Sequence, residues 1–127
     1  MKRFIYVILC VLPLLLSCEK ESSFADYYVR YEMSTSSQYV KNSRKISVNT
    51  DLGVKEYSTD LNGFTETFGP FKKGFNANIT VVYVSDYPGA TTTLKIYVSR
   101  GQEPFALKAE TVGGQKTVSA SYTIDFN

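Results

Sequence analysis

Apolar and polar residues alternate along most of the chain after residue 26, with the period of two that is typical of half-buried β-strands. The clearest case is the C-terminal segment 116–126, in which every second side chain is apolar. These apolar side chains are Val118, Ala120, Tyr122, Ile124 and Phe126. A shift by one residue would turn this whole face to solvent, so the register of the segment is strongly defined.

The same alternation recurs in seven earlier segments, which are rich in residues that suit a pleated surface, such as Val, Thr, Tyr and Phe. The predicted strands span 26–34, 44–51, 54–59, 63–71, 74–85, 91–100, 103–111 and 116–126. The side chains predicted to face inward in the earlier strands are Val29, Tyr31, Met33, Ile46, Val48, Phe75, Ala77, Ile79, Val81, Tyr83, Leu94, Ile96, Val98, Phe105, Leu107 and Ala109. After the N-terminal leader, no segment shows the 3.6-residue period of a helix.

Strands with one polar and one apolar face form antiparallel sheets, and the apolar face must be buried against a second layer. The sequence therefore predicts an all-β domain over 26–127, an antiparallel immunoglobulin-like β-sandwich of about seven or eight strands. A small closed β-barrel is the alternative architecture.

Four short segments have the composition of turns. Gly113-Gly114 and Asn62-Gly63 are predicted to supply the positive φ of tight hairpins. Pro88-Gly89 fits the central positions of a type II turn. The segment 72–74, Lys-Lys-Gly, is predicted to reverse the chain between two neighbouring strands.

The N-terminus has the pattern of an export signal. Positive residues at 2 and 3 precede the uncharged stretch 4–17, which is shorter than the ~20 apolar residues of a membrane-spanning helix. The segment 15–18, Leu-Leu-Ser-Cys, resembles the lipobox of bacterial lipoproteins. The resemblance implies that 1–17 is a lipoprotein signal peptide and that Cys18 becomes the lipid-bearing first residue. An ordinary signal followed by a chance cysteine is the alternative.

A lipid on Cys18 would make the membrane a partner, because each buried CH₂ contributes about 0.8 kcal/mol. Residues 18–25 then form the lipidated cysteine and a short tether, and the stretch 19–23 reaches only about 18 Å when extended. Residue 19 is Glu rather than Asp, so the retention signal of the inner membrane in enteric bacteria is absent. The expected location is the cell envelope, with the outer membrane favoured over the inner; the sequence leaves open which face the domain occupies.

Charge and cysteine content narrow the possible functions. Removal of 1–17 would leave twelve basic and twelve acidic residues, and such a neutral domain has no electrostatic basis for binding nucleic acid. Cys10 would leave with the signal and Cys18 would carry lipid, so the domain would contain no disulfide.

The order of several segments resembles the extracytoplasmic domain of the MmpS-like proteins, which are small immunoglobulin-like sandwiches that assist large lipid exporters. The matching segments are Tyr28–Met33, Ile46–Gly53, Phe71–Phe75, Leu94–Val98 and the Gly-Gly pair before the last strand. The comparison proteins are anchored by a transmembrane helix, whereas this chain has a lipobox. More broadly, the chain resembles small immunoglobulin-like lipoproteins of Gram-negative envelopes, and this wider resemblance implies the fold without a transport role.

The chain is not expected to be an enzyme. It has no His, the usual proton shuttle near neutral pH and the commonest metal ligand. Glu103 with Glu110, or Asp60 with Glu66, could form the carboxylate pair of a glycosidase, but solvated charges on strand edges are the simpler interpretation.

A metal site is not expected either, and no cofactor is predicted. Calcium requires several oxygen ligands from one cluster of loops. The candidate ligands are Asp51, Asp60, Asn62 and Asp86, and no loop that holds them has the density of acids that such a site needs.

The ten tyrosines are the unusual feature of the composition. Tyr31, Tyr83 and Tyr122 share the parity of apolar neighbours and are assigned to the core, whereas Tyr28 and Tyr97 have the opposite parity. An outward tyrosine suits contact with a sugar or a protein, although cross-strand pairing is the alternative. The candidate contact residues are Tyr28, Tyr87 and Tyr97.

The sequence also contains two small groups of basic residues. The first consists of Lys41, Arg44 and Lys45, and the second of Lys72 and Lys73. They are expected either to lie near anionic headgroups or to form a solvated rim.

The predicted function is a lipid-anchored, non-catalytic binding or accessory module that acts on an envelope protein through protein–protein contacts. The alternative is a glycan-binding surface lipoprotein that uses exposed tyrosines.

Overall fold

The computed structural model describes residues 25–36, 44–84 and 91–125, and these residues contain all eight predicted strands. The strands are β1 (Tyr27–Thr35), β2 (Arg44–Thr50), β3 (Gly53–Thr59), β4 (Gly63–Phe71), β5 (Asn76–Tyr83), β6 (Thr92–Arg100), β7 (Ala106–Gly113) and β8 (Thr117–Thr123). The predictions for 1–17, Cys18, the tether up to residue 24, Asp86, Tyr87, Pro88-Gly89 and Phe126 lie outside the described residues. No helix in the described ranges is long and apolar enough to cross a membrane.

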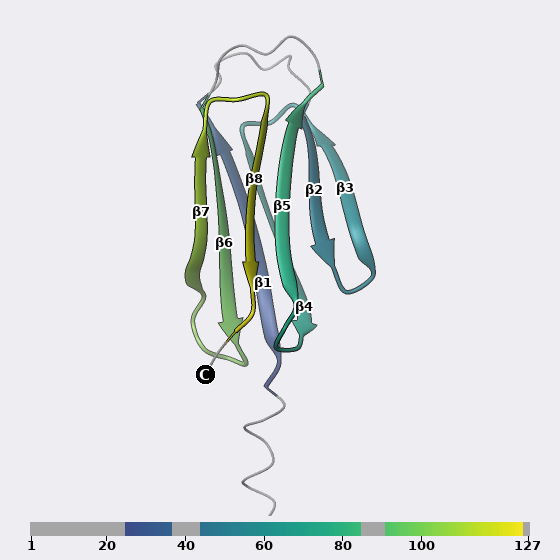
Figure 1. Cartoon of the computed structure of the whole chain (residues 1–127), viewed down its shortest axis with the longest axis vertical. Coiled ribbons are helices and arrows are strands. Elements are labelled where there is room, and N and C mark those ends of the chain that lie inside the picture. Colours follow the sequence, from purple (N-terminus) through teal and green to yellow (C-terminus); the bar gives the residue numbers. More distant parts are fainter. Residues whose placement is uncertain (1–24, 37–43, 85–90, 126–127) are drawn as a thin grey trace, which may run out of the picture.

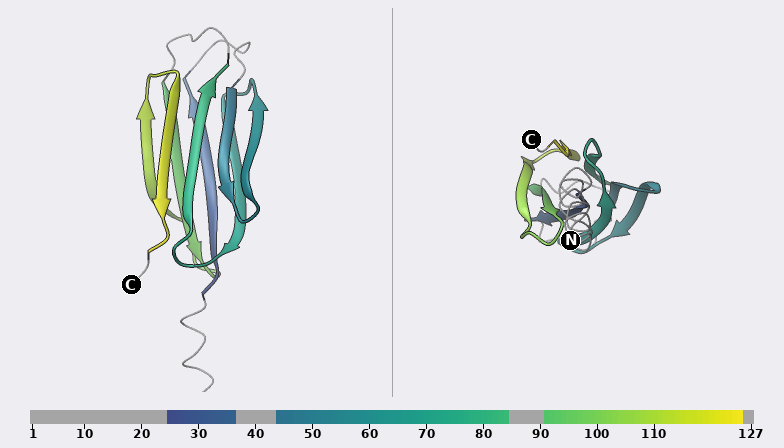
Figure 2. Two further views of the ribbon diagram at one scale, coloured as in Figure 1. Left: turned by 45° about the vertical axis from the view of Figure 1, so that its right-hand side comes forward. Right: turned by 90° about the horizontal axis from the view of Figure 1, so that it is seen from below.

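The strands form two four-stranded antiparallel sheets, in the order β4-β1-β6-β7 and β3-β2-β5-β8. The sheets pack face to face with their strands along the long axis of the molecule (Figure 1, Figure 2). They remain two separate sheets, so the predicted sandwich is confirmed and the alternative of a closed barrel is wrong.

The core lies between the sheets and consists largely of the alternate side chains that the sequence pattern assigned to it. Phe75 and Tyr122, which were also assigned to the core, are only half-buried, and Tyr27 and Phe71 are buried in addition. Fully buried members include Tyr31 and Ile96 of one sheet and Ile46 and Ile79 of the other. The Tyr31 hydroxyl reaches across the core and donates a hydrogen bond to the carbonyl oxygen of Asn49, at 2.8 Å. The polar tip of this large buried ring is therefore satisfied by the facing sheet.

Stability at high pH tests the burial of Tyr31. Burial raises the pKa of its hydroxyl far above the usual value, and a hydrogen bond with the backbone of Asn78 offsets only part of this rise. The stabilising contribution of the neutral hydroxyl is complete below the unfolded-state pKa of about 10 and is lost progressively above it. Urea titrations at about pH 9 and pH 11 should show that Tyr31→Phe loses about 1 kcal/mol less stability than the wild type over this interval.

Tyr28→Phe is the matched control, because Tyr28 lies on the outward side of the same strand. If the wild type and Tyr31→Phe lost the same stability between the two pH values, the burial of the Tyr31 hydroxyl would be contradicted.

The predicted apolar face of the seventh strand is interrupted. Ile96 pairs with Ala109, but the next residue, Tyr97, pairs with Leu107, so β7 contains one extra residue at this point. Such a bulge reverses the facing of the residues before it. The prediction that Phe105, Leu107 and Ala109 share an inward face was therefore wrong, and Leu107 is 47% exposed.

Two of the predicted hairpin turns were also wrong. Neither Gly113-Gly114 nor Asn62-Gly63 has a positive φ. The reason is that β7 and β8, like β3 and β4, belong to different sheets, so the chain crosses the sandwich there instead of pairing with itself. The turn at 72–74 reverses the chain as predicted, with Gly74 at φ 96°, although it too joins strands of different sheets, β4 and β5. The β2–β3 hairpin uses Gly53 at φ 104°.

Arg44 is buried, which corrects its assignment to a basic surface group. Its Nη1 donates to the carbonyl oxygen of Leu61 at 2.7 Å and its Nη2 donates to Oδ1 of Asn62 at 3.2 Å. Its guanidinium carbon lies 5.1 Å from the centre of the Tyr83 ring. Lys45 is exposed, as expected, and Lys41 lies outside the described residues.

The buried guanidinium also acts on Tyr83, whose hydroxyl shares hydrogen bonds with Thr35 at 3.1 Å and Thr92 at 3.3 Å. Burial alone would raise the pKa of this hydroxyl. These hydrogen bonds, another to Arg44 and the positive charge of Arg44 outweigh burial, so the pKa of Tyr83 lies below its usual value. A polar network thus closes one end of the apolar core.

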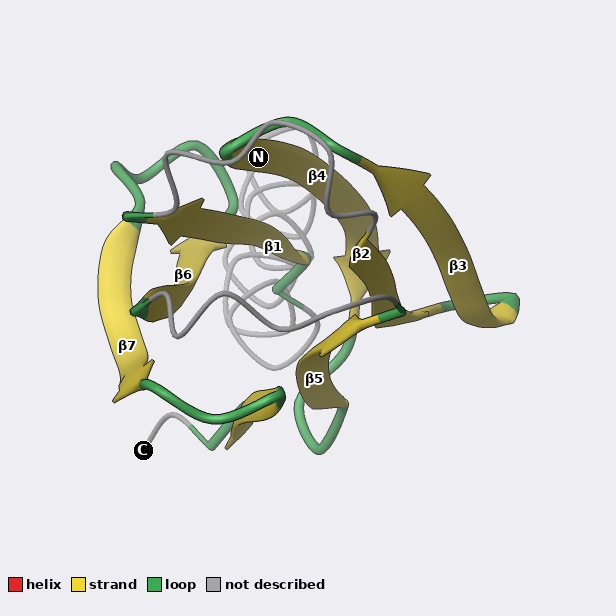
Figure 3. Ribbon diagram, turned by 90° about the horizontal axis from the view of Figure 1, so that it is seen from above, coloured by secondary structure: helices red, strands yellow, loops and turns green. Residues whose placement is uncertain are grey.

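The two flanks of the sandwich differ. On one flank the chain passes directly from β7 to β8 and joins the sheets (Figure 1, Figure 3). On the other flank the chain also passes directly from β3 to β4, which are likewise the terminal strands of their sheets, but the backbones of these two strands lie farther apart than those of β7 and β8. The β3–β4 flank is therefore the open side of the domain.

Candidate functional site

The structure places two of the three predicted contact tyrosines on one surface. Tyr28 of β1 and Tyr97 of β6 are half-buried and lie on the outer face of the sheet β4-β1-β6-β7. Their outward parity is confirmed. Tyr87 lies outside the described residues, so its position relative to them stays a prediction.

The ring of Tyr97 is already engaged. The guanidinium carbon of Arg30 lies 4.5 Å from the centre of the Tyr97 ring and 4.7 Å from that of Phe105. The Nε of Arg30 is 3.4 Å from a carboxylate oxygen of Glu32. Arg30 therefore covers ring surface on which a sugar would stack, which lowers the value of Tyr97 as a platform.

A shallow depression of about 420 Å³ lies beside this cluster on the same sheet. Its polar lining includes Glu32, Thr65, Thr93 and Lys95. Glu32 and Lys95 are cross-strand partners on β1 and β6, so side chains of opposite charge line the depression. This depression can offer hydrogen bonds to a polar ligand, and two of the rings on the same face, Tyr97 and Phe105, already lie against Arg30.

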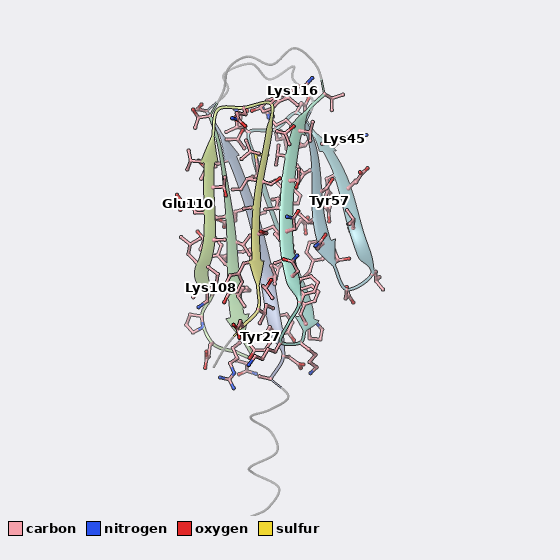
Figure 4. All side chains as sticks on the ribbon, in the orientation of Figure 1. Tyr27, Lys45, Tyr57, Lys108, Glu110 and Lys116 are labelled. Atoms are coloured by element: carbon pink, nitrogen blue, oxygen red, sulfur yellow. The ribbon has the colours of Figure 1, made fainter. Side chains whose placement is uncertain are left out.

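The open flank carries a second aromatic cluster, which sequence reasoning missed. The rings of Tyr57 on β3 and Phe64 on β4 lie 4.9 Å apart and are tilted by 59°. The Nζ of Lys55 lies 5.1 Å from the centre of the Tyr57 ring and 5.8 Å from that of Phe68. We call Lys55, Tyr57, Phe64 and Phe68 the flank cluster. It bridges the two sheets, and Figure 4 shows Tyr57 on this side of the molecule.

The side chains of the flank cluster have inward parity, since Lys55 and Tyr57 pair with the buried residues Val48 and Ile46. They nevertheless remain exposed or half-buried because the sheets do not meet at this edge. A lysine on the inner side of an edge strand also discourages aggregation. The pattern in the sequence was a strand with no apolar face, which is typical of an edge.

Exposed apolar side chains also occur on β3 and in the turns at its two ends. Leu52 in the turn before β3, Val54 within β3 and Leu61 in the turn after it are 94%, 65% and 63% exposed. The exposed large apolar residues of the described chain are Leu52, Val54, Leu61, Val84, Leu107 and Val112. One short edge strand and its two turns thus hold half of them.

The carboxylates considered for catalysis are spread over several elements. Glu103 lies between β6 and β7 and Glu110 lies within β7, whereas Asp60 lies between β3 and β4 and Glu66 within β4. Within the described residues, neither pair shares a hydrogen bond, and no three Cys, Asp or Glu side chains gather as metal ligands.

The second basic group, Lys72 and Lys73, lies at the end of the sandwich where β1 begins (Figure 1). The Nζ of Lys72 lies 2.5 Å from a carboxylate oxygen of Asp26, and that of Lys73 lies 3.9 Å from one of Asp125. Each lysine has an acidic neighbour, so this end offers little net positive charge to anionic headgroups.

Comparisons of the chain with protein-family models, with curated protein sequences and with solved structures give no match. The resemblance to MmpS-like domains and to envelope lipoproteins therefore stays a prediction.

Proposed function

We propose that the protein is a lipid-anchored, non-catalytic module of the bacterial envelope that binds another protein through its β3–β4 flank. The observation that carries this proposal is the pair of half-buried rings, Tyr57 and Phe64, at an edge whose strand β3 and two turns also hold three exposed apolar side chains. Exposed aromatic and apolar surface is typical of protein contact sites. Aromatic rings in such a patch are the side chains that most often dominate binding energy.

An anchor at Cys18 would support weak contacts of this type. A lipid confines the module to the membrane surface, which raises the effective concentration of any partner held at the same membrane. A modest apolar patch then suffices for binding.

The glycan-binding alternative has less geometric support. It needs accessible rings, but Arg30 lies over both Tyr97 and Phe105. The polar depression beside Lys95 is its best remaining feature. Retardation of the protein by a polysaccharide in affinity electrophoresis, lost on Tyr97→Ala, would favour a glycan over a protein partner.

Site-specific photo-crosslinking tests the proposal in the full-length protein within its native envelope. A photoreactive residue replaces Val54 on β3 or, as the matched control, Val112 on β7. Both positions are exposed valines, at 65% and 58%. We expect protein crosslinks from position 54 in at least severalfold excess over position 112, because only the first lies on the open flank.

Equal yields at the two positions, or no protein crosslink from position 54, would overturn the proposed contact surface.

A further inference from the structure

The open flank is acidic. Asp51 and Asp60 lie in the turns that bound β3, Glu56 lies within it, and Glu66 lies within the facing strand β4. All four carboxylates are exposed, and none forms an ion pair within the described residues. Lys55 is the one basic residue of β3, and its ammonium group lies near aromatic rings. Together, β3, its two turns and β4 hold four negative charges and one positive charge, whereas the whole chain has a net charge of +2.

The free edge of β3 also presents backbone N–H and C=O groups that can form hydrogen bonds with another chain. β3 pairs with β2 along seven residues, and on its other side no strand of the described chain follows. In an antiparallel strand, alternate N–H and C=O groups point away from the paired neighbour. An extended segment can join such an edge by main-chain hydrogen bonds while its side chains provide specificity.

From these two observations, and resting on the proposed function, we infer that the flank binds an extended, basic segment of another envelope protein. The segment adds to β3 as the fifth strand of the sheet β3-β2-β5-β8. Its inward side chains are apolar and contact Tyr57 and Phe64 of the flank cluster, and its outward side chains are Lys or Arg and pair with Glu56. Charge complementarity then selects the partner, and main-chain pairing fixes its direction and register.

A second copy of this chain is a poorer occupant. It would bring the same excess of negative charge to the interface. In a symmetric antiparallel pair centred on the middle of β3, Glu56 would stand directly opposite Glu56 of the other copy. Like charges in directly opposed cross-strand positions are destabilising.

Binding of short synthetic peptides to the full-length protein in detergent tests the inference by fluorescence anisotropy. One peptide alternates Val or Tyr with Lys, and a second has Glu in place of each Lys. A third is the basic peptide with every other backbone nitrogen methylated, which removes the main-chain donors and keeps the charge. The basic peptide should bind at least roughly tenfold more tightly than either of the others.

Two charge reversals locate the site. Glu56→Lys should weaken binding of the basic peptide by roughly tenfold, because it replaces an attraction with a repulsion. Glu110→Lys makes the same change on β7, on the opposite side of the molecule (Figure 4), and should leave binding unchanged. Circular dichroism and urea titration of both variants confirm that they are folded.

The outcomes separate this inference from the proposed function. If Val54 crosslinks to a protein but the methylated peptide binds as well as the basic one, or the acidic peptide binds better, strand addition by a basic segment is overturned while the contact surface stands. Equal effects of Glu56→Lys and Glu110→Lys would also overturn the inference. Mass spectrometry of the crosslink from position 54 should identify a basic, extended segment, and an acidic or helical segment would count against it.

Discussion

Replacing Arg44 by alanine should destabilise the domain by about 3 kcal/mol, the scale expected for a large-to-small substitution in a core. Arg44 is among the largest side chains that the fold buries completely. Its removal leaves a cavity between the sheets and takes away the donors that fix Leu61 and Asn62 in the turn after β3. Urea unfolding followed by tyrosine fluorescence measures the loss, since the chain contains no tryptophan.

Lys45→Ala is the control, because it truncates the next residue on the exposed side of β2 and should change stability by no more than about 0.5 kcal/mol. Arg44→Met keeps much of the volume without the charge and should recover part of the loss. If Arg44→Ala unfolded at the same urea concentration as Lys45→Ala, the structural role of the guanidinium would be refuted.

Replacing Cys18 by serine should abolish fatty-acid labelling of the protein and remove any chain processed after residue 17 from the membrane fraction. The physical reason is that acyl chains contribute about 0.8 kcal/mol per buried CH₂. Growth with a labelled fatty acid, followed by fractionation and mass analysis, measures both effects.

Cys10→Ser changes the other cysteine of the chain and should leave labelling and fractionation unaffected. A processed, unlabelled Cys18→Ser chain that stayed with the membrane would contradict lipid anchoring, and with it the envelope role proposed above.

The strands were predictable because burial on one side imposes a period of two on each of them, whatever their partners are. The failures concern relations between strands. The bulge opposite Ile96 is a property of the β6–β7 pair, so the alternation in 103–111 alone could not show that Leu107 faces outward. The glycine turns were misread because turn composition does not reveal whether the next strand joins the same sheet.

In the candidate site, too, the alternation within one strand predicted some features, whereas features that depend on two strands were missed. Parity sufficed to place Tyr28 and Tyr97 outward, and it could also have placed Arg44 inward, since Arg44 shares a face with Ile46 and Val48. The alternation within a strand could not predict the flank cluster, because Tyr57 and Phe64 have inward positions and are nevertheless partly exposed to solvent. Their exposure depends on how far apart two edge strands lie in the folded sandwich, and those strands belong to different sheets.

All eight strands run along the long axis, and β1 begins at one end of it (Figure 1). If a lipid tether holds that end at the membrane and the long axis lies along the membrane normal, the free edge of β3 also runs along the normal. A neighbour diffusing in the same leaflet could reach it sideways, without tilting either molecule.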